Sequence, residues 1–399
     1  MKILIITPRI PYPPFRGDKL KIYNLSKILN KNNDVYILTF LGDLSEEKDL
    51  ELLKKENISI EAIKQFKYSS LINLIKSFFT SAPFQISYYY SKKMRNRITE
   101  LTSINKYDVV YFHLINSAQY YEAVKNKDIL KVIDFTDSTS LYLTRYLEFL
   151  KNPFRRLFFS IELKRILKYE QIVKKFDTLF VCSSVDKQFL IERNVHNNIQ
   201  ILLNGFDIDT FRFEKIKKEK GRIVFVGNMT YFPNIDAVVY FSNEIFPLIL
   251  NKIPEAKLYI VGQNPTKEVI DLQSDNIIIT GFVEDLKKEY LVSEVNIAPI
   301  RFGSGTLNKI IEAIALGIPI VATSLASQGF PSELKKYIHI KDHPKEIADE
   351  IISILSENDT IGKKLIEGRE VISQMLSWEK IVKDFENYLK KRINRKIYY

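Results

Sequence analysis

Short apolar runs rich in β-branched residues alternate with longer segments of helical period along the whole chain, and this alternation restricts the fold more than any other feature. Each run has the length of a buried strand, and each intervening segment is long enough for a helix that covers a sheet. The pattern predicts an α/β fold with parallel sheets. The expected strands are Lys2–Ile6, Val35–Phe40, Val109–His113, Val132–Phe135 and Thr178–Cys182, followed by Arg222–Val226, Lys257–Val261, Ile277–Ile279, Val295–Pro299 and Ile320–Ala322.

The length and one turn signal predict two domains. The chain has 399 residues, and domains usually hold about 100–200. An Asn-Gly turn at Asn204–Gly205 precedes a charged, apolar-poor stretch over 214–222, which is typical of a linker. We therefore predict two doubly wound domains, 1–205 and 206–377, with a ligand site in the cleft between strand ends.

The last segment, 378–399, is expected to form a terminal helix. Its apolar residues recur at helical spacing, so one face can be buried, and we expect it to pack back on the first domain. These residues are Trp378, Ile381, Phe385 and Leu389. Other helical patterns cover 19–29, 235–250, 307–316 and 345–355.

Composition excludes several classes of protein. Cys182 is the single cysteine, which excludes a disulfide scaffold and fits a reducing compartment. Aromatic residues at 12% and hydrophobic residues at 46% exclude disorder as the main state. The apolar run at Lys2–Ile6 is too short for a signal peptide, and no run approaches the roughly 18 apolar residues of a spanning helix. We expect a cytoplasmic protein.

Positive charge is concentrated in the first half of the chain. Basic residues exceed acidic ones by nine in 1–210 and by two in the remainder. The stretch 64–97 has seven basic residues, no acidic residue and eight aromatic ones, and 151–175 is a second basic and aromatic stretch. Two interpretations are open: a face for anionic lipid at the inner side of the cytoplasmic membrane, or a solvated basic surface. Nucleic-acid binding is disfavoured because no motif for it occurs.

The segment 298–313 carries the strongest chemical signal. A buried strand ends, a Gly-Ser-Gly loop follows at 303–305, Thr306 is placed to cap, and a helix begins. Free backbone N–H groups and a positive helix end at a strand edge suit a phosphate group. Lys309 and Glu312 share a helix face, an arrangement that would suit a nucleoside diphosphate and its ribose hydroxyls. The alternative from spacing alone is an ordinary glycine-rich turn with a surface ion pair.

This segment resembles the donor-binding signature of family-4-like glycosyltransferases, and further motifs across the chain share the resemblance. The motifs are Arg9–Pro14 with Gly17-Asp18, Asn204-Gly205-Phe206-Asp207, Phe225–Met229 with Pro233-Asn234, Gly281–Leu286, Gly303–Thr323 and Trp378. The resemblance implies the GT-B fold of two Rossmann-like domains. It also implies that a sugar moves from a nucleotide-diphosphate donor to a hydroxyl of a glycan or lipid-linked acceptor, with retention, in cell-surface polysaccharide or glycoconjugate synthesis.

The same resemblance assigns candidate residues by position. Glu312 is the second acid of the family's Glu-x7-Glu motif, and Ser304 replaces the first acid, as in one subgroup. Arg301 and Lys309 are the expected diphosphate cations, because the Arg that many relatives have near Gly227-Asn228 is absent here. With Glu312 and His113 these two cations form the catalytic set. The expected donor-binding residues are Gly227, Asn228, Glu284, Ser304, Gly305, Thr306 and Leu307, and the expected acceptor-binding residues are Gly17, Asp18 and Asp137.

Two first-domain positions have structural alternatives. His113 ends a strand and matches the family's active-site histidine, although lone histidines beside apolar runs often only pack. Asp137 follows the next strand and either binds an acceptor hydroxyl or belongs to the start of a helix.

We expect no metal and no cofactor beyond the nucleotide sugar, because no cluster has metal-ligand spacing. A catalytically inactive GT-B scaffold, which Ser304 makes possible, and a GT-B sugar-nucleotide epimerase are the alternatives to a transferase.

Overall fold

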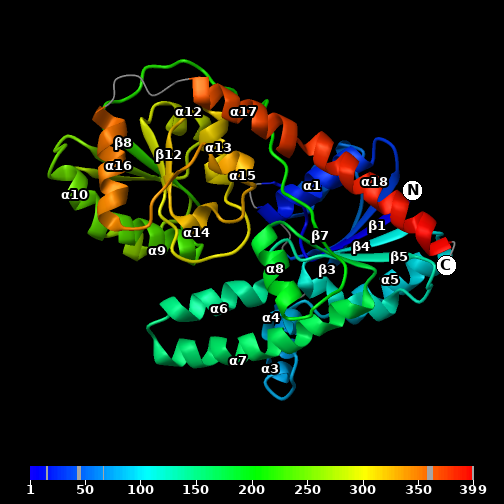
Figure 1. Cartoon of the computed structure of the whole chain (residues 1–399). Helices are drawn as coiled ribbons and strands as arrows, with labels where there is room; N and C mark the ends of the chain where they lie inside the picture. Colours follow the sequence, from blue (N-terminus) through cyan, green and yellow to red (C-terminus); the bar gives the residue numbers. More distant parts are fainter. Residues whose placement is uncertain (15–16, 43–45, 66, 357–362, 398–399) are drawn as a thin grey trace. The chain divides into compact units, whose positions relative to one another are not determined.

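The computed structural model describes residues 1–14, 17–42, 46–65, 67–356 and 363–397. It divides into two compact units, each with its own sheet. Unit 1 contains Met1–Gly205 and Trp378–Tyr399, and unit 2 contains Phe206–Ser377 (Figure 1).

Unit 1 has a seven-stranded, wholly parallel sheet in the order β3-β2-β1-β4-β5-β6-β7. Parallel strands are covered on both faces, so their sequences are continuous apolar runs. The strands are β1 Lys2–Thr7, β2 Asp34–Leu41, β3 Ser59–Lys64, β4 Val109–His113, β5 Leu130–Asp134, β6 Thr178–Val181 and β7 Ile199–Ile201. The register of β4 and β5 places His113 level with Asp134 at the carboxyl edge.

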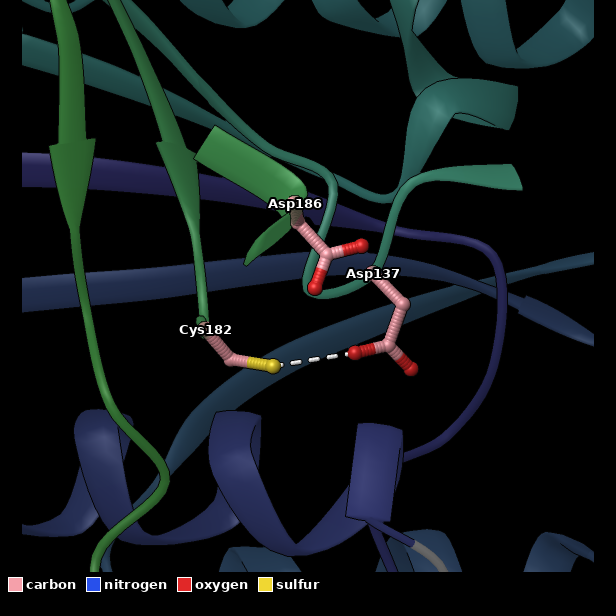
Figure 2. A group of neighbouring side chains, drawn as sticks. All are labelled: Asp137, Cys182 and Asp186. Atoms are coloured by element: carbon pink, nitrogen blue, oxygen red, sulfur yellow. Dashed lines mark hydrogen bonds between the residues drawn. The ribbon is translucent and has the colours of Figure 1, made fainter. Parts of the chain in front are cut away.

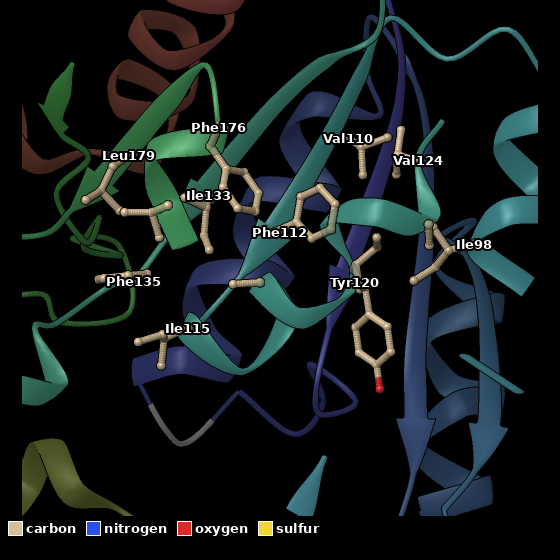
Figure 3. Packing of buried hydrophobic residues seen from close by; sticks show 14 of the residues in the cluster. Ile98, Val110, Phe112, Ile115, Tyr120, Val124, Ile133, Phe135, Phe176 and Leu179 are labelled. Atoms are coloured by element: carbon tan, nitrogen blue, oxygen red, sulfur yellow. The ribbon is translucent and has the colours of Figure 1, made fainter. Parts of the chain in front are cut away.

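Helices cover this sheet and bury one aromatic and aliphatic core (Figure 3). Phe112 of β4 meets Phe176 edge-on at 5.1 Å between ring centroids. The helices of unit 1 are α1 Gly17–Leu29, α2 Glu46–Lys55, α3 Lys67–Ser77, α4 Phe84–Tyr88, α5 Lys92–Ile104, α6 Thr139–Phe149, α7 Pro153–Tyr169, α8 Ser184–Glu192 and α18 Trp378–Ile397, with 3₁₀ segments η1 Ile115–Ala123 and η2 Glu170–Lys175.

The terminal helix α18 is part of unit 1. Phe385 lies edge-on to Tyr111 of β4 and to Phe180 of β6, and Leu389 is fully buried. The hydroxyl of Tyr388 lies 3.0 Å from that of Thr178. The amphipathic pattern of this segment is therefore satisfied by the sheet of unit 1.

Unit 2 has a six-stranded parallel sheet in the order β10-β9-β8-β11-β12-β13. Its strands are β8 Arg222–Val226, β9 Lys257–Val261, β10 Ile277–Gly281, β11 Val295–Ala298, β12 Ile320–Ala322 and β13 His339–Ile340. Its helices are α9 Phe232–Tyr240, α10 Phe246–Leu250, α11 Lys267–Ile270, α12 Leu286–Leu291, α13 Asn308–Ala315, α14 Ser324–Ser327, α15 Ser332–Lys335, α16 Pro344–Ser356 and α17 Lys363–Leu376, with a π-helical turn η3 Phe241–Ile245.

The single helix expected over 235–250 is wrong in detail. The structure has α9, the π-helical turn and α10 in sequence, and Pro247 lies in the first turn of α10. Proline has no N–H for the helical hydrogen-bond ladder, and the ladder changes register just before it.

Within the described residues, no helix combines the length and the apolar character that crossing a bilayer requires.

Candidate active site

The glycine-rich loop of unit 2 connects β11 to α13. Gly303 and Gly305 have φ values of +146° and +78°, which L side chains rarely adopt. A Cβ on Gly329 would lie 2.4 Å from the carbonyl oxygen of Gly305, so a second glycine packs directly against the loop. The helix begins at Asn308, and Leu307 is its N-cap without a side-chain hydrogen bond. The expectation that Thr306 caps the helix is therefore wrong.

This loop forms one wall of a pocket within unit 2. Three residues predicted to bind the donor, Ser304, Gly305 and Leu307, lie in its wall, whereas Thr306 and Glu284 do not. Glu284 is exposed in the loop between β10 and α12. The lining residues are Tyr231, Pro233, Asn234, Ile300, Phe302, Gly303, Ser304, Gly305, Leu307, Leu325, Ala326 and Gln328.

Asn234 links the other predicted donor residues to this pocket. Its side-chain amide donates to the carbonyl of Asn228 at 2.9 Å, and its Oδ1 accepts from Lys309 Nζ at 2.8 Å. A Cβ on Gly227 would lie 2.7 Å from Asn234 Nδ2, so the glycine admits this side chain. Lys309 is buried over the Phe225 ring, 3.8 Å from its centroid, and burial lowers the lysine pKa to about 7.

Glu312 lies one turn further along α13 and is half-buried. The phenol of Tyr290 donates to its Oε2 at 2.6 Å. Burial raises the pKa of Glu312, while the Tyr290 hydrogen bond and the charge of Lys309 oppose that rise. Lys309 and Glu312 thus have separate buried partners, and the alternative of a surface ion pair is wrong.

Arg301 has a partner that the sequence did not predict. Its guanidinium forms two hydrogen bonds with Asp236 of α9, Nε to Oδ2 at 2.9 Å and Nη2 to Oδ1 at 2.5 Å, and stacks over Tyr240. Arg301 is not among the residues that line the pocket. Arg301 is therefore bonded to α9, while its chain neighbours Ile300 and Phe302 line the pocket.

At the strand edge of unit 1, His113 lies in a buried polar cluster. Its Nδ1 is 3.0 Å from the hydroxyl of Thr7, and its Nε2 is buried without a hydrogen-bond partner among the described residues. Burial lowers the pKa of His113 to about 4, so the ring is neutral near pH 7. Asp134 beside it forms a fully buried ion pair with Lys21 at 2.7 Å.

The predicted acceptor residues Gly17 and Asp18 open α1. A Cβ on Gly17 would meet nothing within 4 Å. Asp18 Oδ2 pairs with Arg9 Nη1 at 2.5 Å, and Arg9 also lies over the Tyr89 ring. The Arg9–Asp18 pair therefore ties the loop after β1 to the start of α1.

Asp137 lies in a group with Cys182 and Asp186 (Figure 2). The thiol of Cys182 donates to Asp137 Oδ1 at 2.9 Å, and burial and the charge of Asp186 raise the pKa of Asp137 to about 7. One ligand atom from each of the three lies within 4.8 Å of the others, so the group could hold a metal ion. Both Asp186 oxygens already accept hydrogen bonds, from the Ser138 N–H and the Ser183 hydroxyl, which gives that carboxylate a structural role at the start of α8.

Sequence reasoning missed the partners of the predicted residues. Tyr290 and Asp236 carry no motif, and they are found only through the fold. The Asp137–Cys182–Asp186 group was missed for the same reason, because its members follow different strands. Asn234 did carry a signal, since it stands in the Pro233-Asn234 motif that follows Gly227-Asn228.

Unit 2 thus combines a glycine-rich loop, a pocket and a helix that carries the buried Lys309 and the half-buried Glu312. Residues 220–357 match the model of the family described as glycosyl transferases group 1. The two-unit fold is that of solved GT-B structures. Unit 2 therefore contains a segment that matches the group 1 glycosyl transferase family, and the chain has the GT-B fold.

The solved structures cover nearly the whole chain at low identity. HepE of Anabaena, in complex with UDP and glucose, has a TM-score of 0.69, 12% identity and coverage of 98% of this chain and 99% of its own. TarM has a TM-score of 0.70, 12% identity and coverage of 97% and 98%. Sucrose-phosphate synthase from Thermosynechococcus elongatus has a TM-score of 0.69, 15% identity and coverage of 98% of each chain.

One curated relative is similar in sequence. It is an uncharacterized 44.6 kDa protein in the cps region of Klebsiella pneumoniae. It is 22% identical over 349 residues, which cover 82% of this chain and 84% of the relative.

Proposed function

We propose that this protein transfers a sugar from a nucleoside-diphosphate donor to a hydroxyl of a glycan or lipid-linked acceptor, with retention, in cell-surface polysaccharide or glycoconjugate synthesis. The observation that carries the proposal is the pocket of unit 2, whose wall joins the glycine-rich loop to Asn234. Asn234 in turn holds Lys309. The solved HepE complex with UDP and glucose supports the donor class, and the relative in a cps region supports the setting.

In the proposed reaction the acceptor oxygen forms a bond to the anomeric carbon while the bond from that carbon to the diphosphate oxygen breaks. The acceptor proton passes to a phosphate oxygen of the leaving diphosphate. Backbone N–H groups at Gly305 and Thr306, with Lys309, would stabilise the developing negative charge, because preorganised donors gain most in a dry site. The proposal assigns this stabilisation to the chain itself, without a metal ion.

Glu312 is proposed to bind a donor hydroxyl group through the carboxylate that Tyr290 orients. Hydrogen bonds to a charged group contribute about 1.5–3 kcal/mol, which corresponds to a roughly 10- to 150-fold change in affinity. The experiment is a panel of UDP, GDP, ADP and their sugar derivatives, tested by thermal shift and calorimetry on the wild type and Glu312→Ala. The matched control is Glu268→Ala, which removes an exposed carboxylate from α11 of the same unit.

One nucleotide should raise the melting temperature of the wild type and of Glu268→Ala, and Glu312→Ala should bind it at least tenfold more weakly. A ligand at 100 times its Kd adds about 2.7 kcal/mol to the stability of the form that binds it. If no nucleotide stabilises the wild type, the donor assignment fails and the inactive GT-B scaffold takes its place.

We propose that His113 and Asp137 bind the acceptor. The unpartnered Nε2 of His113 and the carboxyl of Asp137 belong to adjacent strand ends of unit 1. A neutral imidazole and a carboxyl with a pKa near 7 suit hydrogen bonds to sugar hydroxyls. We place the reaction at the inner face of the cytoplasmic membrane, where a lipid-linked acceptor is available.

A further inference from the structure

Two helices of unit 1 expose apolar side chains at the spacing that usually faces a core. On each helix these residues recur three or four apart, so they form a continuous stripe. The stripe on α3 and the turn after it contains Tyr68, Leu71, Ile75, Phe78 and Phe79, and the stripe on α7 contains Phe154, Leu157, Phe158 and Ile161. Single exposed apolar residues are ordinary, but two stripes of this size mark an interaction surface.

Direct contacts join the two stripes into one surface. The Phe84 ring of α4 lies 4.7 Å from Phe78 and stacks at 5.0 Å on Phe158. Glu162 of α7 accepts from the backbone N–H groups of Phe84 and Gln85. Figure 1 shows α3, α4 and α7 in the same part of unit 1. We call the two stripes together the apolar face.

The anchoring of α7 fixes the direction in which its stripe points. Arg165 of α7 donates to the carbonyls of Ser77 and Ala82 at 3.0 and 3.2 Å, and its guanidinium lies over the Phe84 ring. On the other side, Phe159 packs edge-on against Tyr146 of α6. The helix therefore has neighbours within unit 1, and the apolar face stays exposed beside them.

Exposed charge on α3, α4 and α7 has one sign, whereas the neighbouring α6 exposes Glu148. The basic residues Lys76, Lys151, Arg155, Arg156 and Lys164 are exposed on the helices that carry it or directly before α7. The stretch 64–97 has no acidic residue, and between 151 and 168 the single acid is Glu162, which is buried and used by the Phe84 and Gln85 N–H groups. An apolar and basic surface on helices that expose no acid complements a layer with negative headgroups over an apolar interior.

We infer that the apolar face is a docking surface for the anionic lipid of a bilayer, into which Phe79 and Phe154 insert while the surrounding Lys and Arg side chains contact the headgroups. Phe79 and Phe154 are 87% and 82% exposed, the two most exposed apolar side chains on the face. This inference deepens the proposed function and rests on it for the setting at a membrane, but the binding itself requires no sugar donor.

The aliphatic members of the face favour lipid over nucleic acid. Leu71, Ile75, Leu157 and Ile161 are each more than 40% exposed and offer nothing to a phosphate or a base. A surface for single-stranded nucleic acid also combines basic residues with stacking aromatics, but it has no use for these exposed aliphatic side chains. Insertion of apolar side chains into the boundary between headgroups and acyl chains makes use of every member of the face.

The experiment is co-sedimentation of the full chain with vesicles. Vesicles of phosphatidylcholine alone are compared with vesicles of equal parts phosphatidylcholine and phosphatidylglycerol, at low and high salt. The wild type should bind the anionic vesicles at least tenfold more tightly than the neutral ones, and salt should weaken that binding.

Two double variants test the apolar and the ionic contributions to vesicle binding separately. Phe79→Ser with Phe154→Ser should reduce binding to anionic vesicles at least tenfold, and the control Ile104→Ser with Ile366→Ser, which removes exposed apolar side chains elsewhere, should not. Arg155→Ser with Arg156→Ser should also reduce binding to anionic vesicles. Its control, Lys215→Ser with Lys217→Ser in unit 2, should not.

Several outcomes would overturn the inference: no wild-type binding to anionic vesicles, equal loss in the test and control variants, or binding to single-stranded poly(U) in place of vesicles. The nucleotide panel is measured on the same proteins. Nucleotide binding without vesicle binding removes the docking surface alone, and vesicle binding without nucleotide binding removes the donor proposal alone.

Discussion

At the scale of single residues, His113 shows how burial sets the charge of the strand edge. The side chain is 2% exposed, and desolvation outweighs the attraction of Asp134 and Asp18 for an imidazolium. The folded ring therefore has a pKa of about 4, whereas an unfolded histidine has one of about 6.5. Between these values the unfolded chain binds a proton that the folded chain does not.

The stability of unit 1 should therefore fall as the pH falls from 6.5 towards 4. Above pH 6.5 the ring is neutral in both the folded and the unfolded chain, and the full stability is present. At pH 5 the unfolded chain is protonated at His113 and the folded chain is not, which lowers the free energy of unfolding by about 2 kcal/mol. Replacement by His113→Gln should remove that part of the pH dependence. The measurement is urea unfolding at pH 7 and pH 5 followed by the fluorescence of Trp378, the single tryptophan, which is buried in unit 1.

The control for this prediction is His343→Gln, which replaces an exposed histidine in unit 2. It should leave the difference between pH 7 and pH 5 as in the wild type. Equal pH dependence of the wild type and His113→Gln would show that His113 is not held neutral by the fold.

At the scale of residues, the sequence indicated the motifs that line the pocket but not the residues that form hydrogen bonds with Lys309 and Glu312. Ser304, Gly305 and Leu307 line the pocket together because they stand in one short loop, and a loop is local. Lys309 and Asn234 are 75 positions apart, and Tyr290 and Glu312 are 22 apart, so no helical or strand period connects them. Hydrogen bonds of this kind depend on how strands order themselves in a sheet, which spacing along the chain does not express.

At the scale of elements, the sequence predicted every central strand but only one of the four edge strands, β10. Four expected strands have the bounds that the structure shows: β4, β8, β9 and β12. They lie inside their sheets, where most of their residues are apolar and buried. The strands that the sequence did not predict, β3, β7 and β13, stand at or next to the sheet edges where burial is partial.

Arg301 and Asp236 give α9 a fixed position on its sheet, and this leads to a prediction about the helix. The ion pair is partly exposed, so each of Arg301→Ala and Asp236→Ala should lower the free energy of unfolding of unit 2 by about 1 kcal/mol. The double variant should lose little more than either single variant, because both remove the same interaction. Thermal unfolding of the three variants measures this coupling.

The same pair of variants tests whether Arg301 also holds the donor diphosphate, as the sequence predicts. If its role is confined to α9, both variants should bind the nucleotide within about threefold of the wild type, less than the tenfold that 1.4 kcal/mol represents. If Arg301 binds the diphosphate, Arg301→Ala should lose affinity and Asp236→Ala should not. Calorimetry with the nucleotide found in the panel distinguishes the two results.

At the scale of the whole molecule, the chain leaves unit 1 at Gly205 and returns to it at Trp378. Each unit has its own contacts between the segments where the chain leaves and returns. In unit 1, a Cβ on Gly205 would lie 2.3 Å from the Trp378 ring, so only glycine allows the indole to pack there. In unit 2, the Phe206 N–H donates to the Leu376 carbonyl at 2.7 Å. Unit 1 therefore includes α18, although this helix follows unit 2 in the sequence.

This dependence predicts that α18 contributes substantially to the stability of unit 1. Phe385 is buried between Tyr111 and Phe180, and replacing a buried Phe by Ala costs about 3–5 kcal/mol. In the full chain, Phe385→Ala should lower the free energy of unfolding by that amount, measured by urea with Trp378 fluorescence. Lys391→Ala, an exposed position on the same helix, should change it by less than about 0.5 kcal/mol.

A second measurement tests the same dependence without relying on a destabilised variant. Residues 1–205 contain no tryptophan, so a peptide of residues 378–399 added to them reports docking through Trp378 alone. Burial of Trp378 should shift its emission to shorter wavelength on binding, because the indole leaves water for the apolar surface beside Gly205. Residues 1–205 should then unfold at higher urea with the peptide than without it. A polypeptide of residues 1–205 that is equally stable without the peptide would show that α18 is an accessory to unit 1.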